Sequence, residues 1–348
     1  MCEQVHCEMD VSKSKCDHKN EGSTVSIHFF HEEWMNDMND MNNSRTTAAD
    51  TDTFPVVPRR DRIHVLREFM LETFDCLQKS NKGIDIVVLD VAGGRGDLSF
   101  VLVNADHFNA VVVDPRLPDH DKIATTCAWY AQHQDEAAEQ AASGQALARL
   151  KLQPPYKAPQ HLSLFFEEEL LQVLSQESRQ QEAFETYWND TRRRIQKLET
   201  KFPSHWKSRS SSNNNSSSNN KKNAATSPRI PPGIVNDPKE AWSILNNVSL
   251  VVGFHSDQAT DACLDFALQR RLPFCIVPCC VFTATFPHRK TIHNKPVSTY
   301  QDYVQYLRRK HGKMRVATLP FHSAAKGNGA GLARNTVLYM LEQDYLSE

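Results

Sequence analysis

Residues 86–97 run Ile-Val-Val-Leu-Asp-Val-Ala-Gly-Gly-Arg-Gly-Asp, an apolar run that ends in a glycine-rich turn. The branched residues from Ile86 to Leu89 predict a buried parallel strand, because strands covered on both faces are apolar without alternation. The glycines let the backbone turn sharply into a helix that we expect to begin near Asp97. A strand, a glycine turn and a helix in this order predict an α/β fold with a nucleotide-type ligand at the turn.

Two carboxylates narrow the choice of ligand. Asp90 stands at the end of the predicted strand, and Asp114 ends a second apolar run, residues 110–113. Asp114 lies about 20 residues beyond the glycines, which is the spacing expected of a ribose-hydroxyl acceptor. A pyrophosphate would be repelled by Asp90 and Asp97. S-adenosylmethionine carries an ammonium and a sulfonium group, so carboxylates around the glycines suit it better.

The turn resembles the first motif of class I S-adenosylmethionine-dependent methyltransferases, which reads acid-x-Ala-Gly-Gly-x-Gly. The matching residues are Asp90, Ala92, Gly93, Gly94 and Gly96. The resemblance implies that these residues and Asp114 bind S-adenosylmethionine, and that a side chain after the third strand contacts the adenine. Three consecutive acidic residues, 167–169, follow that strand, and we include Glu167 in the predicted site. The alternative is that the three residues form the first turn of a helix. A strand-to-helix turn without a ligand is the simpler alternative for the whole motif.

Composition and periodicity divide the chain into a tail, one domain and an insertion. We expect residues 1–55 to form a partly disordered N-terminal extension and residues 56–346 to form the methyltransferase domain. Residues 206–232, rich in Ser, Asn and Lys, cannot bury enough apolar area to offset the entropy of ordering, so they predict a disordered insertion. The resemblance implies a Rossmann-like sheet of seven strands, with helices on both faces and a terminal antiparallel hairpin.

Four candidate catalytic residues follow the fourth and fifth predicted strands. They are His255, Asp257, Cys279 and Cys280. The carboxyl ends of parallel strands meet at one edge of a sheet, so we expect all four to face the same crevice as the glycine turn. His255 or Asp257 could take a proton from an acceptor hydroxyl or orient an amine. The alternatives are a loop hydrogen bond for His255 and a helix cap for Asp257.

The two cysteines allow several roles. A thiolate at this strand end would match the nucleophile of RNA cytosine-C5 methyltransferases, which also carry a second cysteine after the fourth strand, where this chain has none. The thiols could instead line the site without reacting. A zinc site that joins them to His288 or His293 is a further alternative, as is metal binding by the Cys and His residues of the tail. The predicted site contains no metal.

The second half of the domain carries a further resemblance. His255 after a strand, Ala-Thr-Asp at 259–261, another strand and Pro-Cys-Cys at 278–280 resemble a subgroup of methyltransferase-like domains. The subgroup includes the methyltransferase-like domain of the glutathione S-transferase C-terminal-domain proteins. The zinc-finger-bearing tRNA 2′-O-methyltransferases show a looser version of the same pattern. Those relatives read His-x-Cys-Gly where this chain reads His-Ser-Asp-Gln. The resemblance implies RNA, with tRNA favoured, as methyl acceptor. An NAD-dependent Rossmann oxidoreductase and a non-catalytic binding protein are the alternatives.

Composition limits the partners and the compartment. The formal net charge is −2, so no global field indicates a nucleic-acid partner, although basic residues cluster locally at 192–194 and 308–310. No apolar stretch is as long as the about 18 residues that a membrane-spanning helix requires. Nine cysteines without a signal peptide indicate a reducing compartment. We therefore expect a cytoplasmic or nuclear protein without membrane contact, and nothing in the sequence indicates an obligate protein partner.

Overall fold

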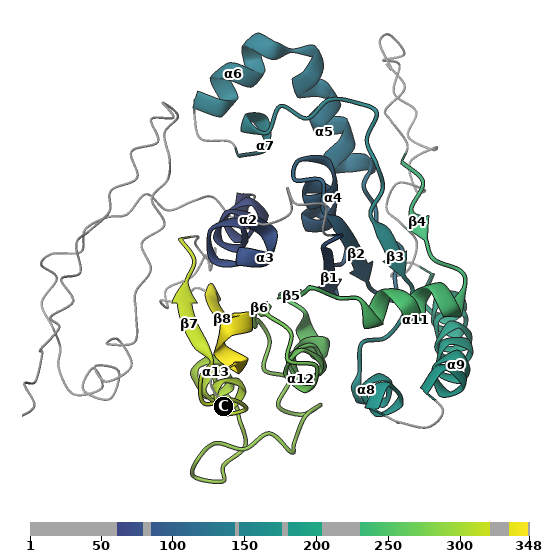
Figure 1. Cartoon of the computed structure of the whole chain (residues 1–348), viewed down its shortest axis with the longest axis vertical. Coiled ribbons are helices and arrows are strands. Elements are labelled where there is room, and N and C mark those ends of the chain that lie inside the picture. Colours follow the sequence, from purple (N-terminus) through teal and green to yellow (C-terminus); the bar gives the residue numbers. More distant parts are fainter. Residues whose placement is uncertain are drawn as a thin grey trace, which may run out of the picture.

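One mixed sheet forms the centre of the protein. The computed structural model describes residues 61–78, 85–142, 146–175, 180–203, 230–320 and 334–346. The strands are β1 (Val87–Val91), β2 (Asn109–Val113), β3 (Gln160–Leu162), β4 (Gly233–Ile234), β5 (Leu250–Phe254), β6 (Phe274–Val277), β7 (Arg315–Thr318) and β8 (Thr336–Met340). Their order in the sheet is β4-β3-β2-β1-β5-β6-β8-β7 (Figure 1). Strands β1 to β6 are parallel, and β8 is antiparallel to both of its neighbours.

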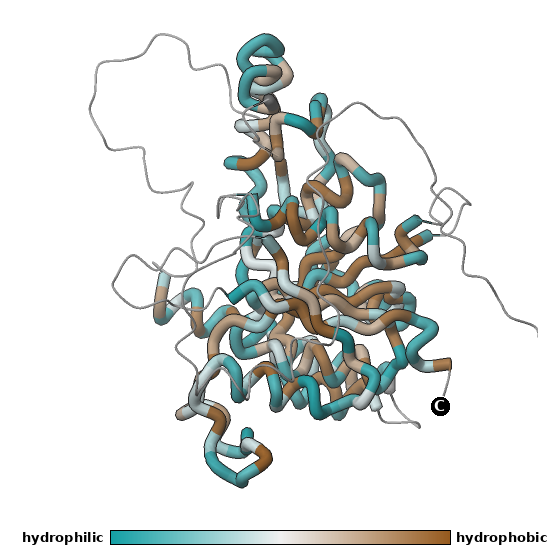
Figure 2. Tube along the Cα trace, turned by 90° about the vertical axis from the view of Figure 1, so that its left-hand side faces the viewer, coloured by the Kyte–Doolittle hydropathy of each residue, from teal (hydrophilic) through white to brown (hydrophobic). Residues whose placement is uncertain are grey.

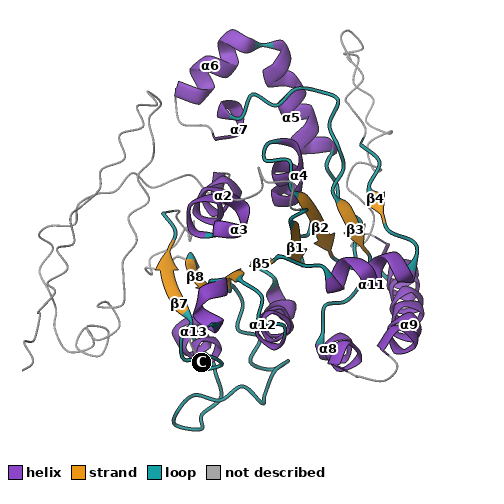
Figure 3. Cartoon of the chain, viewed as in Figure 1, coloured by secondary structure: helices purple, strands orange, loops and turns teal. Residues whose placement is uncertain are grey.

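Helices cover both faces of this sheet, as expected for an α/β fold (Figure 3). They are α2 (Arg62–Thr73), α3 (Asp75–Gln78), α4 (Asp97–Asn104), α5 (Asp121–Gln132), α6 (Gln134–Ala142), α7 (Ala146–Arg149), α8 (Glu168–Ser175), α9 (Gln180–Lys201), α11 (Pro238–Asn246), α12 (Thr260–Gln269) and α13 (Tyr300–Arg308). Two short 3-10 helices, η4 (Asp257–Ala259) and η5 (Glu342–Tyr345), complete the described elements. None of the helices in these ranges combines the length and the hydropathy that crossing a bilayer requires.

Strand β1 has two apolar faces because its side chains alternate between two cores. Val87, Leu89 and Val91 belong to the core shared with α8, α9, α11, α12 and α13. Val88 belongs to the core shared with α2, α3 and α4. Every residue of β1 is therefore buried, which explains the unbroken apolar run in the sequence. The hydrophobic parts of the chain accordingly gather in the interior of the molecule (Figure 2).

The sheet has eight strands where the sequence predicted seven. The additional strand is β4, two residues that pair with β3 at the edge of the sheet, directly after the predicted insertion. A segment of two residues shows no periodicity, so the sequence pattern could not reveal it. The predicted extension lies outside the described residues, as does most of the predicted insertion, because residues 1–60 and 204–229 are not described.

Candidate functional site

A cavity of about 890 Å³ opens at the carboxyl edge of the sheet. Its walls include Ala92 after β1, Asp114 after β2, Phe165–Glu169 after β3 and His255 after β5. The strand order reverses between β1 and β5, because β2, β3 and β4 follow on one side and β6 on the other. Ligands of open α/β sheets bind at such a switch point. The cavity is therefore the candidate functional site.

The glycine turn, residues 92–96, uses its own backbone groups. The N–H of Gly96 donates to the carbonyl oxygen of Gly93 at 2.9 Å. The N–H of Gly94 donates to Oδ2 of Asp114 at 3.1 Å. Gly94 and Gly96 have φ angles of 60° and 74°, a left-handed conformation that glycine adopts without strain. Because both amides are occupied within the protein, neither is free to bind a phosphate group.

Asp90 lies beneath the glycine turn and not in the cavity wall. Its side chain is 1% exposed and accepts a hydrogen bond from Oγ of Ser99 at 2.8 Å. A Cβ atom on Gly93 would lie 2.6 Å from Oδ2 of Asp90, so the missing side chain makes room for the carboxylate. Burial, reinforced by neighbouring carboxylates, raises the pKa of Asp90 to about 6. Of the predicted cofactor residues, Asp90, Gly93, Gly94 and Gly96 support the turn, while Ala92, Asp114 and Glu167 line the cavity.

Asp114 faces the cavity but is covered by a cation. Its carboxylate accepts hydrogen bonds from the backbone N–H of Arg116 at 2.8 Å and from the guanidinium of Arg116 at 3.2 and 3.3 Å. The side chain of Asp114 is consequently 2% exposed, whereas that of Arg116 is 55% exposed. A ligand hydroxyl would reach this carboxylate only if the Arg116 side chain moved away from it. Arg116 is not among the site residues predicted from the sequence, although its place two residues after a carboxylate is typical of an Asx turn.

Glu167 is held at the cavity wall by helix α9. Its carboxylate forms an ion pair with Arg194, in which Nη2 lies 3.1 Å from Oε2. The guanidinium of Arg194 also stacks over the ring of Phe165 at 4.5 Å. Helix α8 begins one residue later, at Glu168. Glu167 is thus a fixed polar group beside an aromatic ring. Glu168 and Glu169 lie in the first turn of helix α8, which is the alternative interpretation of the acidic segment.

The loop after β5, residues 255–258 and called the β5 loop below, is strained. His255 and Asp257 have φ angles of 55° and 47°, which side chains with a Cβ rarely adopt. The carboxylate of Asp257 accepts a hydrogen bond from the thiol of Cys279 at 2.9 Å. The first turn of α12 has no side-chain cap, so the predicted capping role of Asp257 is wrong for that helix. His255 and Asp257 both line the cavity.

Cys279 and Cys280 meet the β5 loop from the end of β6. Their Sγ atoms and a carboxylate oxygen of Asp257 lie within 4.8 Å of one another. Burial and the Asp257 carboxylate raise the pKa of Cys279, so this thiol is protonated at neutral pH. A neutral thiol is a poor nucleophile, which favours the lining role over covalent catalysis. Among the described residues, the group suited to a metal contains Asp257 in place of His288 or His293.

Another part of the cavity wall carries charged side chains whose pairing was not predicted from the sequence. Nζ of Lys310 lies 3.0 Å from Asp261 and 2.8 Å from Asp265. Arg289, which is 1% exposed, also pairs with Asp261 and stacks over Tyr303 at 4.5 Å. Asp261 lies in the first turn of α12, and Asp265 follows it by one helical turn. The spacing of four residues between Asp261 and Asp265 was the sequence signal that the two carboxylates share one cationic partner.

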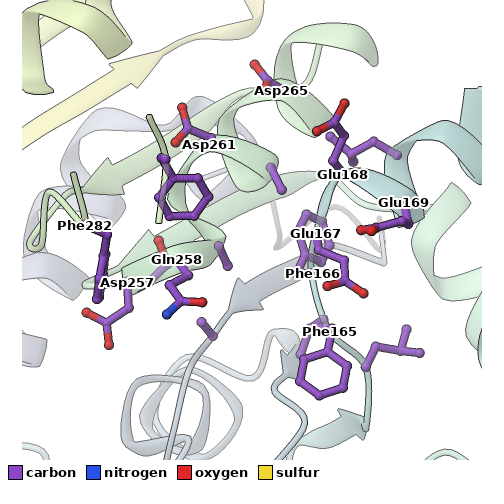
Figure 4. Close-up of a pocket in the computed structure, with 18 of the residues that line it drawn as sticks. Phe165, Phe166, Glu167, Glu168, Glu169, Asp257, Gln258, Asp261, Asp265 and Phe282 are labelled. Atoms are coloured by element: carbon purple, nitrogen blue, oxygen red, sulfur yellow. The ribbon is translucent and has the colours of Figure 1, made fainter. Parts of the chain in front are cut away.

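The cavity lining is acidic overall. Its carboxylates are Asp114, Glu167, Glu168, Glu169, Asp257, Asp261 and Asp265, whereas its Arg and Lys residues are Arg116 and Lys310. Figure 4 shows Asp257, Gln258 and Phe282 on one side of the cavity and Phe165–Glu167 on the other. Such a lining favours a cationic or neutral ligand over a polyanion.

Comparisons were made with family models, with curated proteins and with solved structures. None of the three gives a match to this chain.

Proposed function

We propose that the protein is an S-adenosylmethionine-dependent methyltransferase. The observation that carries the proposal is the cavity at the switch point, which Ala92 of the glycine turn, Asp114 and the acidic segment after β3 border together. Its carboxylates fit the ammonium and sulfonium groups of the cofactor. Asp114 would hold the ribose hydroxyls, and Glu167 with the ring of Phe165 would hold the adenine.

The order of the strands supports the same proposal. A dinucleotide-binding Rossmann sheet has the order 3-2-1-4-5-6. In this sheet the last strand, β8, is antiparallel and lies between β6 and β7. A terminal antiparallel strand of this kind is a feature of class I methyltransferase sheets. The occupied amides of the glycine turn also speak against a pyrophosphate, so the NAD-dependent oxidoreductase is the weaker candidate.

The β5 loop provides the groups that an acceptor would meet. The bound cofactor would supply an activated methyl group, and the transfer of that group depends on positioning more than on strong acid–base chemistry. Asp257 is exposed at the cavity and can accept a proton from an acceptor N–H or O–H. His255 lines the same wall and can orient the acceptor through a ring nitrogen.

RNA is the acceptor class that we propose. An uncharged nucleobase suits the acidic cavity, while the phosphates of the strand would have to remain outside it. A second groove, of about 560 Å³, offers basic and amide side chains for that purpose: Asn189, Arg192, Arg193, Gln196 and Asn236. Residues adjacent in the chain line the two grooves, since Arg116 and Leu164 line the first and Leu117 and Ser163 line the second.

Calorimetric titration of the full chain with S-adenosylmethionine and S-adenosylhomocysteine tests the proposal. We expect both to bind, and Asp114→Ala to weaken binding about 10- to 100-fold, because hydrogen bonds to a charged group contribute about 1.5–3 kcal/mol. Asp190→Ala, which removes an exposed carboxylate on α9, should leave the affinity unchanged. A folded wild-type protein with no affinity for either compound would refute the proposal.

Two further measurements separate the alternatives. NADH added to the same calorimeter should give no heat of binding; tight NADH binding would favour the oxidoreductase. Tritium-labelled cofactor incubated with total RNA and with protein extract should label the RNA fraction. A protein that binds the cofactor and labels neither fraction would be the non-catalytic relative.

A further inference from the structure

The ends of β5 and β6 bring three metal-ligating side chains to one point. We propose that Asp257, Cys279 and Cys280 form a zinc site at the edge of the cavity. One carboxylate oxygen and two sulfur atoms lie within 4.8 Å of one another, although the residues come from loops separated by helix α12 and strand β6. This metal binding does not depend on the proposed methyltransferase activity, and while zinc is bound the Asp257 carboxylate would not serve as the proton acceptor proposed above.

The donor set selects the metal. Two thiolates favour a borderline-soft ion over Mg²⁺ or Ca²⁺, and zinc accepts sulfur and carboxylate oxygen together. Zn–S bonds of about 2.3 Å in a tetrahedron place two sulfur atoms roughly 3.8 Å apart. The two sulfur atoms, now within 4.8 Å of one another, would therefore have to close by at most about 1 Å. Side-chain rotation can supply a shift of that size.

Zinc binding would replace the protons on the two thiols with bonds to the metal. The thiol of Cys279 now donates its hydrogen to Asp257 at 2.9 Å, which shows that sulfur and carboxylate already share one small space. Zinc would displace the S–H protons of both cysteines to solvent and form a bond to each sulfur. The guanidinium of Arg334, 3.4 Å from Sγ of Cys280, would have to move away, which its exposed position allows.

Three protein ligands leave one position of a tetrahedron open. Zinc sites with three protein ligands and an open position are typical of catalytic zinc, whereas structural zinc sites have four protein ligands. Cys279 is buried and Cys280 half-buried, while Asp257 is exposed and lines the cavity. The open position therefore faces the cavity on the Asp257 side, where water or an added ligand would complete the coordination.

The experiment uses the full chain without added cofactor. Zinc affinity is measured by competition with a chromophoric chelator, and cobalt is substituted to reveal thiolate-to-metal charge-transfer absorption. We expect the wild type to bind one equivalent at this site. Asp257→Ala and Cys280→Ser should each weaken zinc binding at least about 100-fold, because even outer-shell changes cost about 10- to 100-fold. The charge-transfer band should weaken in Cys279→Ser and Cys280→Ser and remain in Asp257→Ala, which keeps both sulfurs.

A matched control separates this site from other thiols. Cys76→Ser alters a half-buried cysteine on α3 and should retain the wild-type affinity and band. The cysteines of the amino-terminal tail stay in every variant, so any metal that they hold is common to all. Circular dichroism confirms that each variant is folded, and the exposed position of Asp257 makes its variant the least disruptive. Equal zinc affinity in Asp257→Ala, Cys280→Ser and Cys76→Ser would overturn the proposal, whatever the result of the cofactor titration.

Discussion

The glycine turn and the β5 loop follow neighbouring central strands, yet they use their polar groups in opposite ways. The glycine turn occupies the Gly94 and Gly96 amides and the Asp90 carboxylate internally, and two of its three left-handed residues are glycines, the third being Ala92. The β5 loop assigns left-handed conformations to His255 and Asp257 and turns a carboxylate toward the cavity. Strain outside glycine is typical of functional segments. The comparison fits the proposed roles, in which the turn supports the fold and a bound ligand and the loop carries the chemistry.

The largest loss of stability is expected from a side chain added inside the glycine turn. A Cβ on Gly96 would lie 2.6 Å from Cε1 of His120, and a φ of 74° strains any other residue. Overpacking costs about 1–3 kcal/mol and a left-handed conformation about 1–2 kcal/mol, so Gly96→Ala should lower the free energy of unfolding by roughly 2–5 kcal/mol. Urea unfolding measures this. Gly94→Ala has no atom within 4 Å of the new Cβ and should lose only about 1–2 kcal/mol. Equal losses would contradict the packing argument.

The next effect is a pH dependence that comes from Asp90. Its pKa of about 6 in the folded protein exceeds the ordinary value of 3.8, so the unfolded state ionises first as the pH rises. The stabilisation by the protonated carboxyl is complete below about pH 4 and is lost as the pH rises through about 6, a change of about 3 kcal/mol. Asp90→Asn should remove this component. Urea unfolding from pH 4 to 7 should then show a smaller fall for the variant; parallel curves would exclude Asp90 as the source.

In the β5 loop, a substitution should lower the activity without lowering the stability of the fold. Asp257→Asn keeps the shape of an exposed side chain, so the free energy of unfolding should change by less than about 1 kcal/mol. If Asp257 takes the acceptor proton, tritium transfer to RNA should fall about 100- to 10,000-fold. Glu139→Gln, at an exposed carboxylate of α6 that does not line the cavity, is the control and should retain transfer. Similar rates in both variants would assign the proton to another group.

The smallest effect should come from the exposed ion pair of the glycine turn. Arg95 pairs with Asp97 at 2.9 Å, and the two side chains are 47% and 29% exposed. Exposed pairs contribute about 0–1 kcal/mol. Arg95→Ala should therefore change the free energy of unfolding by less than about 0.5 kcal/mol in urea unfolding. A loss as large as that of Gly96→Ala would show that the charges, and not the buried groups, stabilise the turn.

The strands and the meeting of the β5 and β6 ends could be predicted from the sequence because both follow from simple geometry. Unbroken apolar runs gave β1 and β5, and parallel strands necessarily bring His255, Asp257 and Cys279 to one edge. The spacing of the helices was less accurate. The polar stretch 172–203, with large apolar residues at intervals, predicts one long helix, whereas the structure has two elements, α8, which already begins at Glu168, and α9.

The direction of side chains could not be predicted. Asp90 has the right place along the chain for a ligand contact, but the room beneath Gly93 draws its carboxylate into the interior. Asp114 lies at the cavity, yet Arg116 covers it. Lys310 reaches Asp261 from the turn after α13, far along the chain. Each outcome depends on tertiary packing, which no local pattern records.

The place of β8 in the sheet has a consequence for how the protein is made. Strand β7 pairs with β8, and β8 also pairs with β6, so β7 reaches the rest of the sheet through a strand that is synthesised after it. Chains fold during synthesis from the N-terminal side. While the ribosome translates this chain, β6 therefore keeps an open edge until Met340 has emerged, and a nascent chain that stalls before that residue presents that edge to chaperones or to other chains.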